Sequence, residues 1–218
     1  MIVVKPALTF GERLRAFRLR LEVFSESGYL DPGRFPWGYE YDEFDILSDI
    51  FVAVDSDGDR VVGTIRFVHD GPLGFPSERV FADEIARWRG EMRGRSLGYM
   101  EASRIAILRP YRRSRVFPGL MAAMWRYGIE KGIASYCWTN TLEDSEIYIK
   151  FGAKLETPEP KSYRSMQGTK AVMMRWDLAE TVPRYVDRFT ALVDDGSVRM
   201  PPPGHPVRSS ADPWERRA

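Results

Sequence analysis

Residues 50–68 read IFVAVDSDGDRVVGTIRFV, two runs of apolar residues separated by a short polar segment. Val, Ile and Phe dominate both runs, and β-branched and aromatic residues favour strands. Asp57-Gly58 lies between the runs, and an Asp-Gly pair favours a tight turn because glycine adopts positive φ without steric cost. The sequence therefore predicts an antiparallel β-hairpin, and the flanking elements are assigned outward from it.

The segment before the hairpin predicts a strand, a helix and a loop. Residues 2–5 form a short β-type run, and a helical pattern begins at Gly11. Apolar residues recur there every three or four positions, which places them on one helix face: Leu14, Phe17, Leu21 and Phe24. The intervening arginines are expected mostly on the other faces: Arg13, Arg15, Arg18 and Arg20. Residues 28–41 are rich in Gly, Pro and aromatics and predict an irregular loop.

The segment after the hairpin alternates helix and strand patterns. Helices are expected within 77–93, at 116–132, at 144–152 and near 180–194, and strands at 98–108, 134–140 and 170–177. A helix, then an antiparallel hairpin, then alternating strands and helices is an α+β order. We expect one domain over residues 1–197. Residues 198–218 are proline-rich and polar, and are expected to form a disordered tail.

Composition argues against several classes of function. The formal net charge is +1, so nothing global favours nucleic acid or a membrane surface. Cys137 is the only cysteine, and the two histidines are His69 and His205, which makes a His/Cys metal site implausible. The first residues lack the features of a signal peptide, and no apolar stretch is long enough to span a membrane. A cytoplasmic protein without a bound metal or permanent cofactor is expected.

Short charged motifs flank the hairpin and lie within it. They are Arg20–Phe24 (RLEVF), Glu40–Asp45 (EYDEFD), Arg66 at the end of the hairpin, and Glu101–Arg104 (EASR). In this order they resemble the R-x-x-V-F, E-x-D-x-x-D and E-x-S-R signatures of LuxI-type acyl-homoserine-lactone (autoinducer) synthases. The sister group of N-acyl amino acid synthases has a similar site. The resemblance covers roughly residues 15–155.

The resemblance implies a GNAT-like acyltransferase fold, with a central, mostly antiparallel twisted sheet flanked by helices. It also implies transfer of a fatty acyl group to the amine of a small molecule. Two features depart from the lactone synthases: Tyr29 stands nearest to the place of a usual tryptophan, and the loop over 30–39 is long. Both favour the N-acyl amino acid synthases.

Acyl transfer to an amine needs a base, a polarised thioester and both reactants in line. Glu101 is the first candidate for the base, and Ser103 and Arg104 of the same motif are expected beside it in the catalytic site. Asp42 and Asp45 are candidates to hold the amine, provided that their segment is helical or turned.

Further candidate substrate contacts are Arg20, Phe24, Tyr29, Trp37 and Arg66. The arginines either clamp a substrate carboxylate or pair with the acids to fix the loop. For Phe24 a core position is favoured over a substrate contact, and the loop aromatics either cap the acceptor pocket or anchor the loop.

The donor side is predicted from a basic run before the helix at 116–132: Arg109, Arg112, Arg113 and Arg115. Acetyltransferases of this fold carry a glycine-rich pyrophosphate loop there. Here Arg115 and Phe117 occupy the glycine positions, so close approach of the backbone to pyrophosphate is disfavoured. An acidic acyl carrier protein with its phosphopantetheine arm suits the run better than coenzyme A (acyl-CoA), and an unpartnered basic surface is the alternative.

Three functions stay open at this point. The first is an N-acyl amino acid synthase that uses acyl carrier protein and a small amino-acid-like acceptor. The second is a lactone synthase that uses S-adenosylmethionine. The third is a non-catalytic module that binds acyl carrier protein or a lipid, which the complete set of Glu101, Asp45 and Arg104 disfavours.

Overall fold

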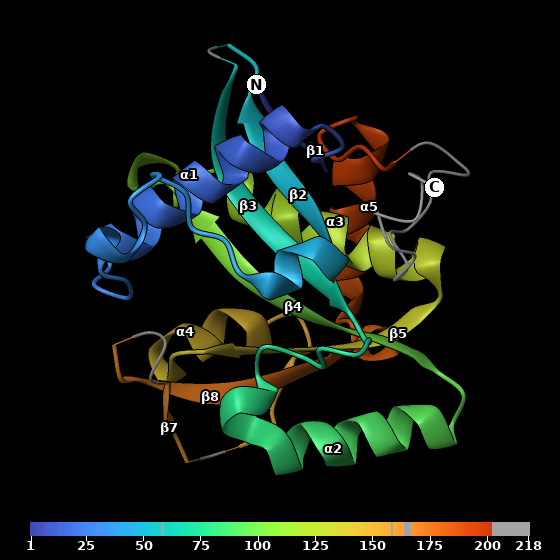
Figure 1. Ribbon diagram of the computed structural model, residues 1–218. Coiled ribbons are helices and arrows are strands. Elements are labelled where there is room, and N and C mark those ends of the chain that lie inside the picture. The colour runs from blue at the N-terminus through green and yellow to red at the C-terminus, as the bar shows by residue number, and fades with distance from the viewer. Residues whose placement is uncertain (58, 158, 164–166, 202–218) are drawn as a thin grey trace, which may run out of the picture.

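The computed structural model describes residues 1–57, 59–157, 159–163 and 167–201, which are built around one twisted sheet (Figure 1). The strand order is β1-β2-β3-β4-β5-β8-β6, and β7 pairs with β8. Neighbours run antiparallel except β4 and β5, which are parallel. The strands are β1 Ile2–Pro6, β2 Ser48–Asp55, β3 Arg60–His69, β4 Gly98–Ile107, β5 Ile133–Asn140, β6 Lys154–Leu155, β7 Lys161–Tyr163 and β8 Thr169–Asp177.

The predicted hairpin is confirmed as β2 and β3. Their ladder runs from the Ser48–Val68 pair to the Asp55–Arg60 pair. Gly58, the glycine of the predicted turn, lies outside the described residues. Both strands are buried on both faces, and the ring centroids of Phe51 and Phe67 lie 5.4 Å apart. Burial on both faces explains why these strands are continuously apolar instead of alternating.

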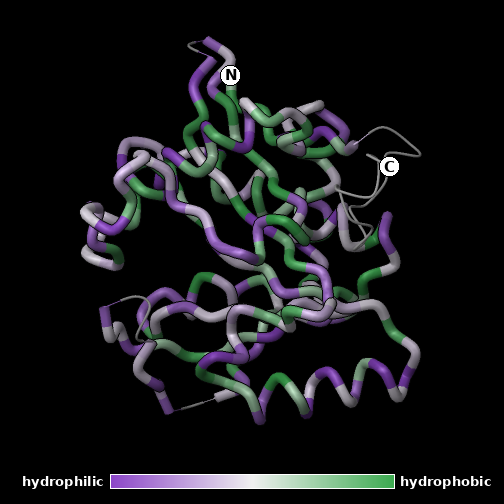
Figure 2. The backbone as a smooth tube through the Cα atoms, in the orientation of Figure 1, coloured by the Kyte–Doolittle hydropathy of each residue, from purple (hydrophilic) through white to green (hydrophobic). Residues whose placement is uncertain are grey.

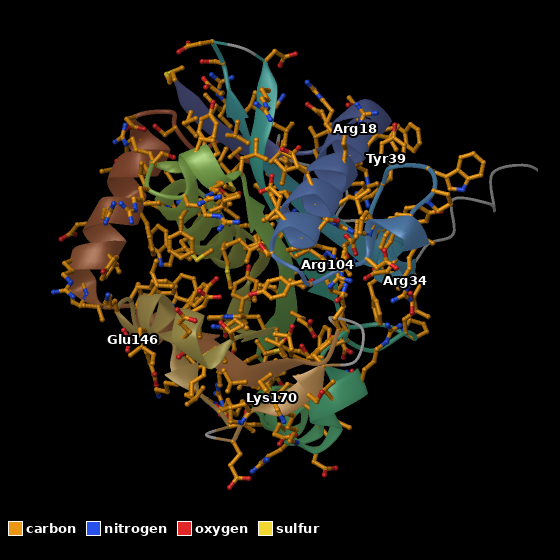
Figure 3. The ribbon with its side chains drawn as sticks, turned by 90° about the vertical axis from the view of Figure 1, so that its left-hand side faces the viewer. Arg18, Arg34, Tyr39, Arg104, Glu146 and Lys170 are labelled. Carbon is orange, nitrogen blue, oxygen red and sulfur yellow. The ribbon has the colours of Figure 1, made fainter. Side chains whose placement is uncertain are left out.

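Helices cover both faces of the sheet. Two views agree that α1 lies on one face and that α3 and α5 lie on the other (Figures 1 and 3). In Figure 2 hydrophobic residues concentrate along the central strands, whereas hydrophilic and hydrophobic residues alternate along α2. The core therefore forms between the sheet and its helical layers. The helices are α1 Phe10–Glu26, α2 Glu78–Gly94, α3 Val116–Lys131, α4 Leu142–Ile149 and α5 Pro183–Asp194.

The helix α1 carries the first charged motif into the interior. Thr9 and Glu12 form a capping box at its start, which satisfies backbone N–H groups that have no partner within the helix. Phe17 and Phe24 of the predicted stripe are buried. Arg20 was expected off this stripe, but its side chain is fully buried, so that expectation was wrong for Arg20. Carboxylates supplied by the following loop neutralise the buried charge.

The strands β4 and β5 start close together and then separate. Their parallel ladder ends at the Glu101–Cys137 pair, although β4 continues to Ile107 and β5 to Asn140. At the closed end a Cβ on Gly98 would collide with the backbone carbonyl of Gly132, so only glycine allows this approach. The separation leaves a wedge-shaped gap in the middle of the sheet.

The C-terminal part contains structure that the sequence did not predict. The two short strands β6 and β7 pair with β8. Val198 and Arg199, at the start of the expected tail, pair with Val4 of β1, and Val198 is buried. The rest of that tail, residues 202–218, lies outside the described residues. Among the described helices none is long and apolar enough to cross a membrane.

Candidate active site

The charged motifs meet in one buried cluster of arginines and carboxylates. Its members are Arg20, Arg66, Arg104, Glu40, Asp42 and Asp45. Arg20 donates from Nε to Glu40 Oε2 at 2.5 Å, and from its two Nη atoms to the two Asp45 carboxylate oxygens at 2.8 Å. A guanidinium bound to a carboxylate in this bidentate way is fixed in both position and orientation.

Arg66 and Arg104 link the cluster to β4. Arg66 donates to Asp42 Oδ1 at 2.5 Å and to Ser103 Oγ at 3.0 Å. Arg104 donates from Nε to Glu40 Oε1 at 2.9 Å and from Nη2 to Asp42 Oδ2 at 3.0 Å. Glu40 and Asp42 therefore each bridge two arginines, and the loop that carries them is held against β3 and β4.

Asp42 and Asp45 lie in a turned segment, the condition under which they share a face. Asp42 caps the short 3-10 helix η2 (Glu43–Leu47), and Asp45 closes the capping box by accepting from the Asp42 N–H. Burial alone would raise the pKa of Asp45, but the hydrogen bonds and charge of Arg20 lower it overall. Since guanidinium groups engage both carboxylates, the geometry supports their role in fixing the loop over direct capture of an amine.

Glu101 has a different environment. It lies on β4 at the last pair of the β4–β5 ladder and is 1% exposed. Burial raises the pKa of Glu101 to about 7, although a hydrogen bond from the Ser77 N–H and the charges of Arg66 and Arg104 oppose the shift. At neutral pH a carboxyl with this pKa is present in both its protonated and its deprotonated form, which suits a general base.

A bulge interrupts β4 directly after Ser103, two residues beyond Glu101. Arg66 faces Ser103 and Thr64 faces Ala106, so Arg104 and Ile105 together stand opposite Ile65. Arg104 adopts a φ of 54°, which is uncommon for a residue other than glycine. Such strain at a cavity wall is typical of functional sites. The bulge also breaks the ladder, so a backbone N–H at this point can turn toward the gap.

Two adjoining cavities occupy the gap between β4 and β5. The outer cavity has a volume of about 140 Å³, and its lining includes Phe24, Tyr29, Glu101, Ser103, Arg104, Tyr148 and Tyr163. The inner cavity, of about 50 Å³, reaches Met121 and Met124 of α3 and Trp138 of β5. Both are lined by Ser103, Arg104, Ile105, Thr139, Asn140 and Tyr148, so they form one cleft. In Figure 3 Arg104 lies between α1 and the part of the sheet that contains β8.

The predicted aromatic contacts fall in different places. Phe24 and Tyr29 line the outer cavity, and their ring centroids lie 6.5 Å apart. Trp37 does not line it and is 78% exposed. Its neighbour Tyr39 packs under the Arg18 guanidinium, and Figure 3 shows the two together. Of the three predicted aromatic contacts, the structure therefore brings Phe24 and Tyr29 to the cleft.

Two arginines of the predicted basic run line a third cavity. This basic cavity has a volume of about 230 Å³, and Arg112 and Arg113 line it, whereas Arg109 and Arg115 do not. Arg115 instead lies 3.4 Å from Asp195. Met121 lines both the basic cavity and the inner cavity, which places the two on either side of one α3 residue.

Several site residues were missed by sequence reasoning. Lys150, directly after α4, and Arg188 on α5 add positive charge to the basic cavity, although both are far from the arginine run in sequence. Tyr148 and Tyr163 line the outer cavity. Tyr163 lies on the unpredicted strand β7 and donates to the Pro76 carbonyl at 3.0 Å. Only the pairing of distant segments brings these residues together, and no local motif indicates it.

The described residues contain no candidate metal site, that is, no group of three or more His, Cys, Asp or Glu residues that could hold an ion. Cys137 is buried, and burial raises the pKa of its thiol well above the ordinary value. A buried thiol of this kind is a poor nucleophile.

Comparison with known proteins identifies the family. The model of the family described as "N-acyl amino acid synthase FeeM" matches residues 15–177, and the chain therefore belongs to this family. None of the curated protein sequences matches it.

Solved structures show the same fold. The FeeM N-acyl amino acid synthase from uncultured soil microbes is 20% identical, with a TM-score of 0.67 over 85% of this chain and 97% of that one. The CoA-dependent acyl-homoserine lactone synthase BjaI is 19% identical, with a TM-score of 0.66 over 92% and 94%. The lactone synthase LasI is 21% identical, with a TM-score of 0.59 over 82% and 89%. The predicted GNAT-like fold is confirmed, and the protein is an acyltransferase.

Proposed function

We propose that this member of the N-acyl amino acid synthase family transfers a long-chain acyl group from acyl carrier protein to the amine of an amino acid. One observation carries the proposal: Glu101, with a pKa raised to about 7, lines a cleft where two strands separate. The cleft is lined by apolar and aromatic side chains together with the carboxyls of Glu101 and Asp144 and the guanidinium of Arg104. This is the combination that amine acylation requires.

In the proposed reaction the amine nitrogen attacks the thioester carbonyl carbon. A backbone N–H at the bulge around Arg104 and Ile105 donates to the oxyanion that develops. Glu101 accepts a proton from the attacking amine, the C–S bond breaks, and the proton passes to the departing thiolate. The products are an N-acyl amide and a free thiol, and the enzyme returns to its starting state without a covalent intermediate.

Arg104 supports an acceptor that carries a carboxylate. Its Nε and Nη2 atoms are bound to Glu40 and Asp42, whereas Nη1 has no recorded partner among the described residues. The side chain lines both cavities of the cleft. The remaining N–H groups can bind the α-carboxylate of an amino acid and hold its amine near Glu101.

Charge at the basic cavity supports a carrier protein as donor. Arg112 and Arg113 lie beside Lys150 and Arg188 there, and acyl carrier protein is acidic. Its phosphopantetheine arm would enter past Met121 into the inner cavity. The similar BjaI is a CoA-dependent enzyme, so acyl-CoA is the alternative donor. The proposed donor is found in the cytoplasm, and the proposal places the reaction there.

Incubation of the purified protein with dodecanoyl acyl carrier protein and an equimolar mixture of amino acids tests this function. Mass spectrometry should detect an N-dodecanoyl amino acid whose formation depends on Glu101. Acyl-homoserine lactone, formed only when S-adenosylmethionine is added, would replace this proposal with the lactone synthase. The absence of any acylated product from folded protein, with either acyl carrier protein or acyl-CoA, would contradict both.

A further inference from the structure

Two buried polar atoms on β5 lack hydrogen-bond partners and belong to residues that line the cleft. They are the Trp138 indole Nε1 and the Asn140 side-chain Oδ1. Residues two apart on a strand point to the same side of the sheet, and both of these residues line the inner cavity. Of the six buried side-chain atoms without a partner in the described residues, these two belong to cavity-lining residues.

Among the buried tryptophans in the described part of the chain, Trp138 is the one whose indole N–H lacks a partner. Trp88 and Trp176 are also buried, and their indole N–H groups donate to Ser135 Oγ at 3.0 Å and Thr181 Oγ1 at 3.1 Å. Buried indole N–H groups usually donate to an acceptor, because a buried N–H without a hydrogen bond costs free energy. The exception therefore indicates that a ligand supplies the acceptor.

Asn140 complements Trp138 because its acceptor is oriented by the fold. The Asn140 Nδ2 donates to the Thr141 carbonyl at 2.9 Å, and a flipped amide would place two oxygens against each other. Oδ1 is therefore the acceptor that lacks a partner, on a residue two positions along β5 from the Trp138 donor. A donor and an acceptor from one strand match a ligand that carries both a C=O and an N–H.

The alkyl part of an acyl chain offers neither group and would leave both atoms unpaired. The phosphopantetheine arm contains two amides, and the proposed route from the basic cavity past Met121 leads it to this wall. We infer that Trp138 donates to an amide carbonyl of the arm and that Asn140 accepts from an amide N–H. The two side chains thus recognise the carrier arm itself, independently of the acyl chain. This inference rests on the proposed function and adds donor recognition to it.

S-dodecyl-pantetheine is a suitable probe, because this thioether carries both amides and has no reactive thioester. Calorimetric titration should give a dissociation constant about tenfold larger for Trp138→Phe and for Asn140→Leu than for the wild type, the scale of one lost hydrogen bond. Dodecanoic acid, which lacks the amides, should bind equally to all three proteins. The matched control Trp88→Phe should bind both probes like the wild type.

The unfolding temperature without ligand is a second measurement, which separates a role in ligand recognition from a structural role. Both Trp138→Phe and Trp88→Phe remove ring volume from the core and should lower the unfolding temperature. Trp88→Phe should lower it more, because it also leaves Ser135 Oγ unpaired, whereas the N–H deleted from Trp138 has no partner in the free protein.

Wild-type affinity of both cleft variants for S-dodecyl-pantetheine would overturn the inference, and so would an equal loss of dodecanoic acid binding. Failure of the wild type to bind the pantetheine probe would also overturn it. Arm binding that depends on Trp138 in a protein without amine acylation would support the subsite and contradict the proposed function. Amine acylation together with arm binding that is unchanged in both variants would support the proposed function and contradict the subsite.

Discussion

The arginine–carboxylate cluster and the neighbouring cleft are both polar, but they differ in how their groups are satisfied. In the cluster Arg20 is fully buried and both Asp45 oxygens accept from it. In the cleft the raised pKa of Glu101 favours its protonated form below about pH 7, and Trp138 and Asn140 lack partners for their buried atoms. Saturated hydrogen bonding indicates a scaffold, and unsaturated hydrogen bonding indicates a place for a ligand.

The largest expected effect comes from breaking the cluster. Arg20→Leu leaves Glu40 and Asp45 buried without their shared cation, and should lower the free energy of unfolding by about 3–5 kcal/mol. Denaturant titration at pH 7 measures this loss.

Arg15→Leu on the same helix is the matched control. Arg15 pairs with Asp59 at 3.3 Å, and that carboxylate is largely exposed, so the loss should be below about 1 kcal/mol. Equal losses for Arg15 and Arg20 would refute the scaffold role of the cluster.

A substitution at Glu101 in the cleft should have the opposite pattern, with a large loss of activity and no loss of stability. Glu101→Gln should lower kcat by about 100-fold or more, the scale of lost general-base help. A carboxyl whose pKa is raised on folding holds its proton more tightly in the folded state, so stability falls as pH rises from about 4.5 to about 7. The variant lacks this penalty and should unfold at the same or a higher temperature than the wild type at pH 8. A large drop in both activity and stability would instead make Glu101 a scaffold residue.

A smaller effect is expected at the basic cavity, which is exposed. Replacing Arg112, Arg113 and Arg115 with Ala should raise the KM for acyl carrier protein by about tenfold and flatten its dependence on salt. A control variant with the same change of charge replaces the distant exposed residues Arg15, Arg60 and Arg95. An identical KM in the two triple variants would leave the basic cavity without a docking role.

The smallest effect is expected at Trp37. Its exposed side chain lies outside the cleft lining, so Trp37→Ala should change stability by less than about 0.5 kcal/mol and leave the KM for the acceptor within about twofold. Steady-state kinetics with the amino acid acceptor checks this. A much larger KM would restore the predicted contact of Trp37 with the substrate.

Local patterns were sufficient to predict the hairpin and the order of the longer helices and strands, but not the short strands β6 and β7. The motifs that meet at the site were recognised from their resemblance to known signatures. Burial of Arg20 was missed because an arginine was assigned to the outer faces of the helix by its charge. Its spacing is that of the buried face, since it lies three residues after Phe17 and four before Phe24. The carboxylates that neutralise its charge belong to Glu40, at the end of an irregular loop, and to Asp45, just after that loop. Sequence also named Asp42 and Asp45 without showing that guanidinium groups occupy their oxygens.

The walls of the cleft were the least predictable part. Tyr163 reaches the outer cavity from β7, a strand of three residues that has too little pattern to recognise. Trp138 and Asn140 read as ordinary members of an apolar strand, because hydrogen bonds that are missing become visible only in three dimensions.

The pH dependence of kcat/KM in the wild type and in Glu101→Gln tests the central claim most directly. The acceptor amine titrates in both reactions, so the ratio of the two values isolates Glu101. The ratio should rise about tenfold per pH unit below pH 7 and level off above it, since the base must be deprotonated and its pKa is about 7. A ratio that stays constant from pH 5 to pH 9 would contradict the assignment of Glu101 as the base.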